Sequence, residues 1–219
     1  MQAIGIFGGT FDPVHLGHLR MAEELAEGLA LAEVRFLPAA RPPHRAEPRS
    51  AAEHRIAMVK LAIADNARFR LDLREFDRPG PSYMVDTLTS LRTELGAAMP
   101  LYLLLGADAF LGIPSWHRWQ TLFELAHIAV AHRPGFTLDA DHTQMSPALR
   151  DAWQSRYRKT PSDGAAGDIL LREITALDIS ASNIRTRLRH GHSTRYLLPE
   201  ATYHYIHSHH LYEKEPHGT

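Results

Sequence analysis

The sequence predicts an α/β fold in which helices cover both faces of a doubly wound parallel sheet, and two observations lead to it. Short apolar runs typical of buried strands alternate along the chain with longer segments whose apolar residues recur at helical spacing. The first 38 residues already contain a strand, a helix and a second strand, which implies parallel pairing with a right-handed crossover. The length of 219 residues favours one large domain.

The short apolar runs locate the individual strands, and the segments with helical spacing locate the helices. The apolar run at 3–7 predicts the first strand, and the turn residues at 8–13 end it. Apolar residues at helical spacing then predict an amphipathic helix over 16–30. Further strands are expected at 33–38, 68–73, 101–105, 127–131 and 169–174. Further helices are expected at 51–64, 83–95, 145–158, 182–190 and 199–207, with helical turns through 107–125.

The composition excludes several classes of function. Lys and Arg number 24 and Asp and Glu 25, so the net charge of −1 argues against non-specific nucleic-acid binding, which needs a basic footprint. The absence of cysteine excludes disulfides, thiolate catalysis and cysteine-ligated metals. The N-terminus lacks the pattern of a signal peptide, and no apolar run approaches the roughly 18 residues of a spanning helix. We therefore expect a cytoplasmic protein with no membrane partner.

The strongest local signal is the eleven-residue string from Gly8 to His18, GGTFDPVHLGH, between the first strand and the first helix. Ligands bind at this place in doubly wound sheets, and glycines beside a helix N-terminus let backbone N–H groups approach a phosphate. The string is neither of the common phosphate loops. It places His15 and His18 on the first helical turn, where residues three apart share a face and can donate to phosphate oxygens. The alternative is a glycine turn with two surface histidines.

Two basic segments suit anionic ligands. The loop at 39–50 contains Arg41, His44, Arg45 and Arg49 against one acid and is stiffened by prolines. A solvated surface loop is the alternative. The stretch 179–199 contains no acid, and Ser180 or Ser182 could cap a helix whose N-terminus, with Arg185, attracts an anion. We expect Arg187 and Arg189 to be solvated.

Three other features have structural alternatives. Trp116 and Trp119 lie near Pro114, and burial in the core is the expectation for Trp119. Asp108 follows a predicted strand, at the ligand-binding edge of the sheet, or caps the next helix. The C-terminal histidines suggest metal binding, yet few acids lie nearby, so surface histidines on a terminal helix are expected and no metal site is predicted: His204, His207, His209 and His210.

The Gly8–His18 string resembles the GxFDPxHxGH motif of the HxGH nucleotidyltransferase superfamily. Within it, the chain resembles the bacterial nicotinate-mononucleotide adenylyltransferases over nearly all of its length. Six further segments carry this resemblance by their order and spacing: Pro42–Arg45, Pro81–Tyr83, Gly106–Asp108, Trp116–Trp119, His132–Gly135 and Ile179–Arg185. The resemblance implies a Rossmann-like nucleotidyltransferase fold with a single domain over 1–219, in which a C-terminal helical part, at about 175–219, completes an ATP site.

The resemblance also implies a reaction and a set of site residues. The reaction is adenylyl transfer from ATP to nicotinate mononucleotide, giving nicotinate adenine dinucleotide and pyrophosphate in NAD biosynthesis, with Mg²⁺ carried on the ATP phosphates. The implied catalytic residues are His15, His18 and Arg185. The implied ATP-binding residues are Gly8, Gly9, Thr10, Phe11, His18, Gly106, Asp108, Ile179, Ser180, Ser182 and Arg185. The implied mononucleotide-binding residues are His44, Arg45, Tyr83, Met84, Trp116, His117 and Arg133, with Trp116 stacking on the pyridine ring.

The sequence departs from the family pattern at two positions, and it leaves two other functions open. Met84 stands where many members have Thr, and His117 where Tyr is common, which bears on recognition of the nicotinate carboxylate. A superfamily enzyme acting on another phosphomonoester, such as pantetheine-phosphate adenylyltransferase, is the close alternative, although those chains are typically shorter. A non-catalytic nucleotide sensor is the distant one. A homo-oligomer is also left open.

Overall fold

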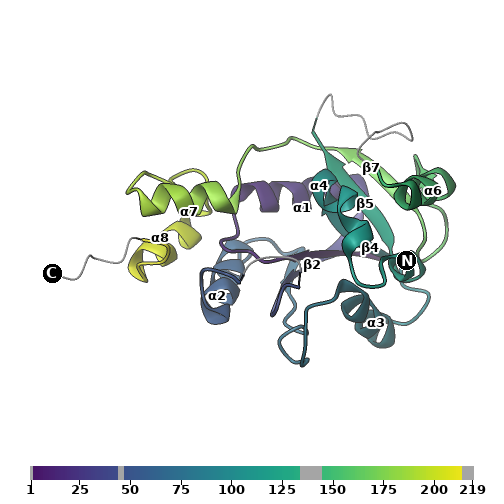
Figure 1. Cartoon of the computed structure of the whole chain (residues 1–219), viewed down its shortest axis with the longest axis horizontal. Coiled ribbons are helices and arrows are strands. Elements are labelled where there is room, and N and C mark those ends of the chain that lie inside the picture. Colours follow the sequence, from purple (N-terminus) through teal and green to yellow (C-terminus); the bar gives the residue numbers. More distant parts are fainter. Residues whose placement is uncertain (1, 44–46, 134–144, 214–219) are drawn as a thin grey trace.

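The structure is a computed structural model that describes residues 2–43, 47–133 and 145–213. Its centre is a seven-stranded sheet of order β3-β2-β1-β4-β5-β7-β6, in which every pair of neighbours is parallel (Figure 1). The strands are β1 (Ala3–Gly9), β2 (Leu31–Pro38), β3 (Phe69–Leu71), β4 (Leu101–Gly106), β5 (His127–His132), β6 (Tyr157–Arg158) and β7 (Ile169–Glu173). The predicted doubly wound α/β sheet is therefore confirmed.

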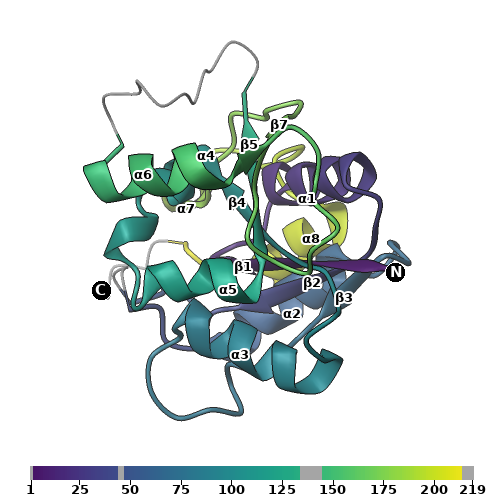
Figure 2. The same ribbon diagram turned by 90° about the vertical axis from the view of Figure 1, so that its right-hand side faces the viewer.

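Helices connect the strands and cover both faces of the sheet. They are α1 (Leu16–Gly28), α2 (Ala52–Ala62), α3 (Met84–Leu95), α4 (Ala107–Leu111), α5 (Leu122–Leu125), α6 (Pro147–Arg156), α7 (Ala181–Arg189) and α8 (Glu200–Ser208). Helices α3 and α5 pack side by side, as Figure 2 shows. Helices α7 and α8 lie together at the end of the molecule remote from α6, beside α1 and α2 (Figure 1). None of the helices in the described ranges is long and apolar enough to cross a membrane.

Two apolar clusters, one on each face of the sheet, form the core. Alternate strand residues point to opposite faces, so Ile6 belongs to the cluster with α3 to α6 and Phe7 to the cluster with α1 and α2. Ile184 of α7 and Ile206 of α8 are fully buried in the second cluster. The C-terminal helices thus share a core with α1, α2 and one face of the sheet.

The strand order reverses between β1 and β4, and this is where a doubly wound sheet opens. From β1 the chain builds outward to β2 and β3, and from β4 it builds in the opposite direction. The two strands pair only from Ile4 with Leu101 to Ile6 with Leu103, so their carboxyl ends diverge. Ligands of open α/β sheets bind outside the carboxyl ends at such a switch point. Gly9 and Gly106, which end these strands, flank it.

The helical turns predicted through 107–125 are confirmed as α4, two 3₁₀ turns and α5, with Pro114 in the first 3₁₀ turn. Two other local details differ from the prediction. Gly8 and Gly9 belong to β1, where they pair with Leu37 and Pro38, so the turn begins later than expected. The two-residue strand β6 was missed, since two residues carry no detectable period.

Candidate active site

The two motif histidines form a stacked pair at the start of α1. His15 is the N-cap with extended backbone, not a residue of the first turn as predicted, and α1 begins at Leu16. The main-chain N–H of His15 donates to Nδ1 of His18 at 3.2 Å. The two ring centroids are 3.6 Å apart with planes at 21°. The predicted shared face therefore exists, although the N-cap geometry creates it.

This hydrogen bond determines the tautomer of His18. Because Nδ1 accepts from the backbone, the proton of the neutral ring lies on Nε2. Two aromatic rings contact the imidazole, Phe11 in a T-shaped arrangement with centroids 5.2 Å apart and Phe7 in a tilted one with centroids 6.0 Å apart. His18 thus presents an oriented N–H donor, which is what a phosphate oxygen requires.

Burial keeps His15 neutral. The residue is 5% exposed. Its Nδ1 atom has no hydrogen-bond partner among the residues that the structure describes. Burial lowers the pKa of His15 to about 4, from an ordinary value of 6.5. Two charged imidazoles stacked at this distance would repel each other, so the neutral state of His15 keeps charge repulsion out of the stacked pair.

Neighbouring side chains crowd the first two glycines of the motif, Gly8 and Gly9. A Cβ on Gly9 would lie 2.9 Å from the ring of Phe11, whose φ of 50° is left-handed. A Cβ on Gly8 would lie 2.6 Å from Cε of Met84, at the start of α3. Met84 therefore contacts the motif directly, which explains why a flexible side chain is accommodated at this position.

Asp12, inside the motif, connects the segments around the site. Its Oδ2 accepts from the main-chain N–H of Arg49 at 2.8 Å, and its Oδ1 accepts from the Ser50 hydroxyl at 2.7 Å. Burial alone raises the pKa of Asp12, but hydrogen bonds from Arg49, Tyr212 and Ser50 and the charge of Arg185 outweigh it, so the net pKa is lowered. Asp12 is thus ionised, and it anchors the C-terminal end of the loop at 39–50, here called the proline-rich loop.

Helix α7 brings its N-terminus and Arg185 against the motif. The Ser180 hydroxyl accepts from the main-chain N–H of Asn183 at 3.2 Å, so Ser180 is the N-cap and the alternative, Ser182, is not. Arg185 donates from Nη1 to the main-chain oxygen of Asp12 at 2.7 Å. Ile179 also approaches the motif, since its Cβ would be 3.7 Å from a Cβ on Gly17.

The other residues predicted for ATP lie at the end of β4. Gly106 is the N-cap of α4 and diverges from β1 at the switch point. Asp108 is exposed in the first turn of α4, and no side-chain cap is made at this helix start. Asp108 is therefore not the N-cap residue, and it lies in the first turn of α4, directly after the carboxyl end of β4.

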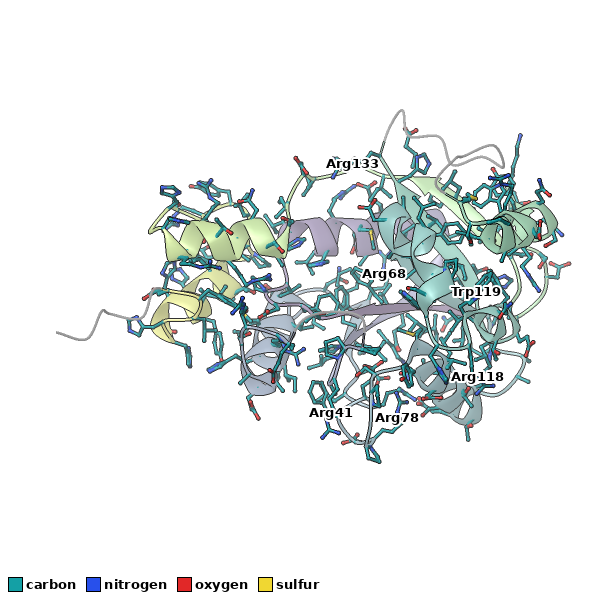
Figure 3. The ribbon with its side chains drawn as sticks, in the orientation of Figure 1. Arg41, Arg68, Arg78, Arg118, Trp119 and Arg133 are labelled. Atoms are coloured by element: carbon teal, nitrogen blue, oxygen red, sulfur yellow. The ribbon has the colours of Figure 1, made fainter. Side chains whose placement is uncertain are left out.

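Four of the residues predicted for the mononucleotide lie near one another, since Tyr83, Met84 and Trp116 border the same core cluster and His117 contacts Tyr83. The rings of Tyr83 and His117 stack with centroids 4.3 Å apart and planes at 28°. Trp116 is half-buried at the rim of the core cluster that Tyr83 and Met84 also border. Trp119 is 8% exposed and belongs to the core, as predicted (Figure 3).

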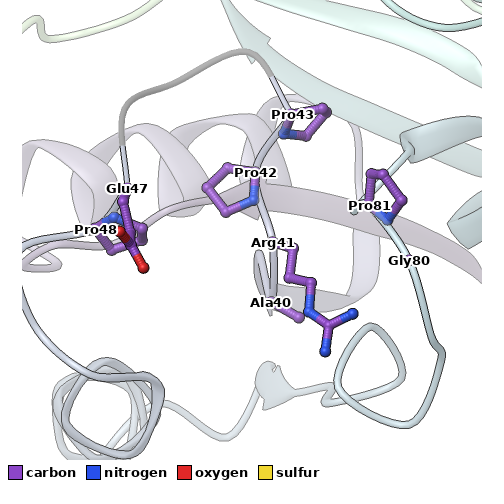
Figure 4. A pocket seen from close by; sticks show the side chains of 8 residues that line it. All are labelled: Ala40, Arg41, Pro42, Pro43, Glu47, Pro48, Gly80 and Pro81. Atoms are coloured by element: carbon purple, nitrogen blue, oxygen red, sulfur yellow. The ribbon is translucent and has the colours of Figure 1, made fainter.

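A pocket of about 520 Å³ lies beside this group, between the proline-rich loop and the segment before α3 (Figure 4). Its lining residues come from both segments: Ala40, Arg41, Pro42, Pro43, Glu47, Pro48, Gly80 and Pro81. Ser82 joins the segments, since its N–H donates to the Arg41 oxygen at 2.9 Å and its hydroxyl accepts from the Arg41 N–H at 3.0 Å. The predicted ligands His44 and Arg45 lie outside the described residues.

Arg133 lies farther from this group. It follows β5, is largely exposed and pairs with exposed Asp178 at 3.2 Å (Figure 3). Exposed pairs of this kind contribute little to stability, so Arg133 can exchange this partner for a ligand at small cost.

Comparisons with known proteins place this geometry in a family. The cytidylyltransferase-like family profile matches residues 6–187. A probable nicotinate-nucleotide adenylyltransferase of Dechloromonas aromatica is 47% identical over 213 residues, covering 96% of this chain and 98% of the relative. A protein of the same description from Pseudomonas paraeruginosa is 49% identical and covers 99% of both chains. The chain belongs to the nicotinate-nucleotide adenylyltransferase family.

Solved structures of remote relatives support the fold. A nicotinic acid mononucleotide adenylyltransferase of Plasmodium falciparum, complexed with NaAD, superimposes with a TM-score of 0.72 at 20% identity, covering 97% of this chain and 98% of that one. A putative nicotinate-nucleotide adenylyltransferase of Vibrio parahaemolyticus gives a TM-score of 0.64 at 14% identity, covering 97% and 96%. The Rossmann-like arrangement expected from the family resemblance is therefore confirmed.

The sequence did not single out four residues that shape the site of this family member. Arg55 is 1% exposed and donates from Nη1 to the main-chain oxygens of Thr10 and Ala39, at 2.9 and 2.8 Å. Its place on the apolar face of α2, three residues before buried Met58, was the available signal. Asp12, Ser50 and Tyr212 meet only in three dimensions, and no local pattern predicts their contact.

The C-terminal histidines do not form a metal site in the part of the chain that is described. No group of three or more His, Asp or Glu side chains there could hold a metal ion. His204 faces Glu200 at 3.5 Å, and His210 faces Glu213 at 3.1 Å, on the exposed side of α8 and beyond it. The surface arrangement expected from the sequence fits these contacts.

Proposed function

We propose that the chain transfers the adenylyl group of ATP to nicotinate mononucleotide in the crevice between β1 and β4, as a cytoplasmic enzyme of NAD biosynthesis. The observation that carries this proposal is the convergence of the His15–His18 pair and Arg185 at the switch point, in a chain whose relatives of this description match it over nearly its full length. The products are nicotinate adenine dinucleotide and pyrophosphate.

The reaction needs charge neutralisation and alignment more than it needs a base. The nucleophile is a phosphate monoester with a second pKa of about 6, so it is largely dianionic at neutral pH. One of its oxygens attacks the α-phosphorus of ATP in line, a new P–O bond forms, and the bond to the β-phosphate oxygen breaks as pyrophosphate leaves. No covalent enzyme intermediate is required.

The two imidazoles and Arg185 supply the neutralisation. Nε2 of His18 is the oriented donor toward a phosphate oxygen, and His15 fixes it through the backbone hydrogen bond and the ring stack. The Arg185 guanidinium, only 3.8 Å from the Asp12 carboxylate, adds a positive charge for the leaving pyrophosphate. The N-terminus of α7, which Ser180 caps, adds the partial positive charge of a helix N-terminus on the same side of the motif.

A divalent cation enters with ATP as part of the substrate, and we assign Mg²⁺ to this role. It neutralises charge on the β- and γ-phosphates. Asp12 already accepts hydrogen bonds through both of its oxygens, so we assign it no metal-ligand role. Exposed Asp108 is better placed to contact a nucleotide hydroxyl.

The mononucleotide binds on the other side of the crevice. The Tyr83–His117 stack and half-buried Trp116 offer flat surfaces for a pyridine ring, and indole faces suit such stacking. The main-chain N–H groups at the start of α3, including that of Met84, suit the nicotinate carboxylate. Arg133 and the loop residues His44 and Arg45 are proposed to contact the mononucleotide. The other residues that the family resemblance implies for ATP and for the mononucleotide are proposed to bind the same two ligands here.

The organisation of the whole chain is part of the proposal. Residues 1–219 are taken as one domain, in which 175–219 form the helical part that completes the ATP site. The partners are ATP and nicotinate mononucleotide, with neither nucleic acid nor membrane. The oligomeric state is left to measurement.

A substrate panel tests the proposed function. We expect pyrophosphate release from ATP to depend on added mononucleotide, with nicotinate mononucleotide preferred over nicotinamide mononucleotide and no release with phosphopantetheine. Release with phosphopantetheine alone would move the chain to the other branch of the superfamily. ATP binding without any turnover would instead indicate a nucleotide sensor.

A further inference from the structure

The side chain of Tyr212 reaches from the C-terminal segment into the motif loop, 200 residues away in sequence. Its hydroxyl donates to Oδ1 of Asp12 at 2.7 Å and lies 2.8 Å from the Ser50 hydroxyl. Ser50 donates to the same carboxylate oxygen at 2.7 Å. Burial and the neighbouring negative charge raise the pKa of Tyr212 well above its ordinary value, so the hydroxyl stays a donor.

The backbone adopts an unfavourable conformation to make this contact. His210 and Tyr212 have left-handed φ angles of 51° and 65°, which residues with a Cβ rarely adopt. Between them, the main-chain N–H of Leu211 donates to Ile206 of α8 at 3.0 Å. Strain of this kind persists only where surrounding contacts over-determine it, and the hydroxyl triangle with Asp12 and Ser50 is such a contact.

Asp12 also binds two other parts of the candidate site, the end of the proline-rich loop and Arg185 of α7. Its carboxylate also accepts from the main-chain N–H groups of Arg49 and Ser50, at 2.8 and 3.2 Å, which end the proline-rich loop. Its main-chain oxygen accepts from Arg185 at 2.7 Å. A displacement of Asp12 therefore changes the loop that faces the mononucleotide and the guanidinium that faces the leaving group.

We propose that Tyr212 is a positioning residue for adenylyl transfer, whose hydroxyl fixes Asp12 and through it both Ser50 and Arg185. The kinetic consequence rests on the proposed function, whereas the fixing of Asp12 is a property of the fold alone. The experiment therefore has one readout for each.

The variant Tyr212→Phe removes only the hydroxyl. Its kcat is expected to fall and its KM for the mononucleotide to rise, so that kcat/KM falls about tenfold, the change equivalent to roughly 1.4 kcal/mol. Amide hydrogen exchange at Arg49 and Ser50 is expected to accelerate, because both N–H groups donate to Asp12. The matched control is Tyr205→Phe, which removes a 2.9 Å contact between α8 and His54 but leaves Asp12 untouched. The control is expected to keep wild-type kinetic constants and wild-type exchange at Arg49 and Ser50.

The outcomes separate the two levels of the inference. Wild-type kinetics in Tyr212→Phe, measured well below its Tm, would show that Tyr212 is only structural and would overturn the proposal, even if exchange accelerated. Unchanged exchange at Arg49 and Ser50 would overturn it at the level of the fold. If the wild-type chain made no dinucleotide, the proposed function would fail instead, and the exchange readout would still decide whether Tyr212 fixes Asp12.

Discussion

At the scale of single residues, the site depends on two imidazoles that share a stack but not an environment. His15 is buried and neutral, whereas His18 has its proton placed on Nε2 by a backbone donor. The sequence motif gives both histidines the same apparent status, and only the geometry separates a positioning ring from a donating one. Three predictions test this scale.

The variant His18→Ala is expected to lose about 10²–10³ in kcat, the loss typical of one transition-state donor. The fold should survive, because the ring packs at the edge of Phe7 and Phe11 without contributing an element of the core. Pyrophosphate release and thermal melting of the purified variant check this. Near wild-type turnover in a folded variant would remove His18 from the mechanism.

The depressed pKa of His15 predicts a pH dependence of stability. Below about pH 6.5 the unfolded chain binds a proton at His15, but the native state does so only near its pKa of about 4. The free energy of unfolding should therefore decrease by about 2–3 kcal/mol between pH 7 and 4. Urea unfolding of wild type and His15→Asn at pH 7 and 4.5 measures it, and the variant should show the smaller decrease. Equal decreases would mean that His15 titrates normally.

Trp116→Ala separates stacking from packing. Trp116 is half-buried at the rim of the core, so its truncation should weaken the binding of nicotinate mononucleotide by about 1–3 kcal/mol, seen as a higher KM. The KM for ATP should stay nearly unchanged. A fully buried tryptophan would instead lose about 3–5 kcal/mol of stability. Steady-state kinetics and thermal melting distinguish these results. A large loss of Tm with an unchanged KM would leave the stacking role without support.

At the scale of elements, α2 and the proline-rich loop are held by contacts at three points. Ser82 binds the loop near its start, Asp12 binds its end, and Arg55 of α2 reaches under it to Thr10 and Ala39. The guanidinium of Arg55 is buried among backbone carbonyls, and burial lowers its pKa although Asp12 opposes the shift. The proline-rich loop at 39–50 is thus anchored to the motif loop that contains Thr10 and Asp12.

Arg55→Lys is expected to destabilise the protein by about 1–3 kcal/mol, because Nη1 of Arg55 donates to both carbonyls and the shorter lysine side chain does not bring its nitrogen to the same point. Lys60→Arg, an exposed change on the same helix, should alter stability by no more than about 0.5 kcal/mol. Urea unfolding of both variants gives the comparison. Equal stability of Arg55→Lys and wild type would show that Arg55 does not tie the two loops together.

At the scale of the whole molecule, the strand order reverses between β1 and β4, and Arg185 of the C-terminal helix α7 lies against the motif. Much of the fold was predictable from the sequence. Short apolar runs alternating with segments of helical spacing predicted the sheet and nearly every helix, and the Gly8–His18 string indicated the candidate site. The N-cap position of His15 was not predictable, because boundaries depend on individual hydrogen bonds. The contacts of Arg55 and Tyr212 were also beyond the sequence, since no local period reports which distant segments meet.

The central claim is direct adenylyl transfer between two anions held in this one crevice, and ATP labelled at the α-phosphorus tests it most directly. Without mononucleotide, direct transfer predicts no label on the protein and no pyrophosphate release. With nicotinate mononucleotide, it predicts that the label appears in nicotinate adenine dinucleotide, with one pyrophosphate for each molecule formed. Label retained covalently on the protein, or consumption of ATP without labelled dinucleotide, would contradict it.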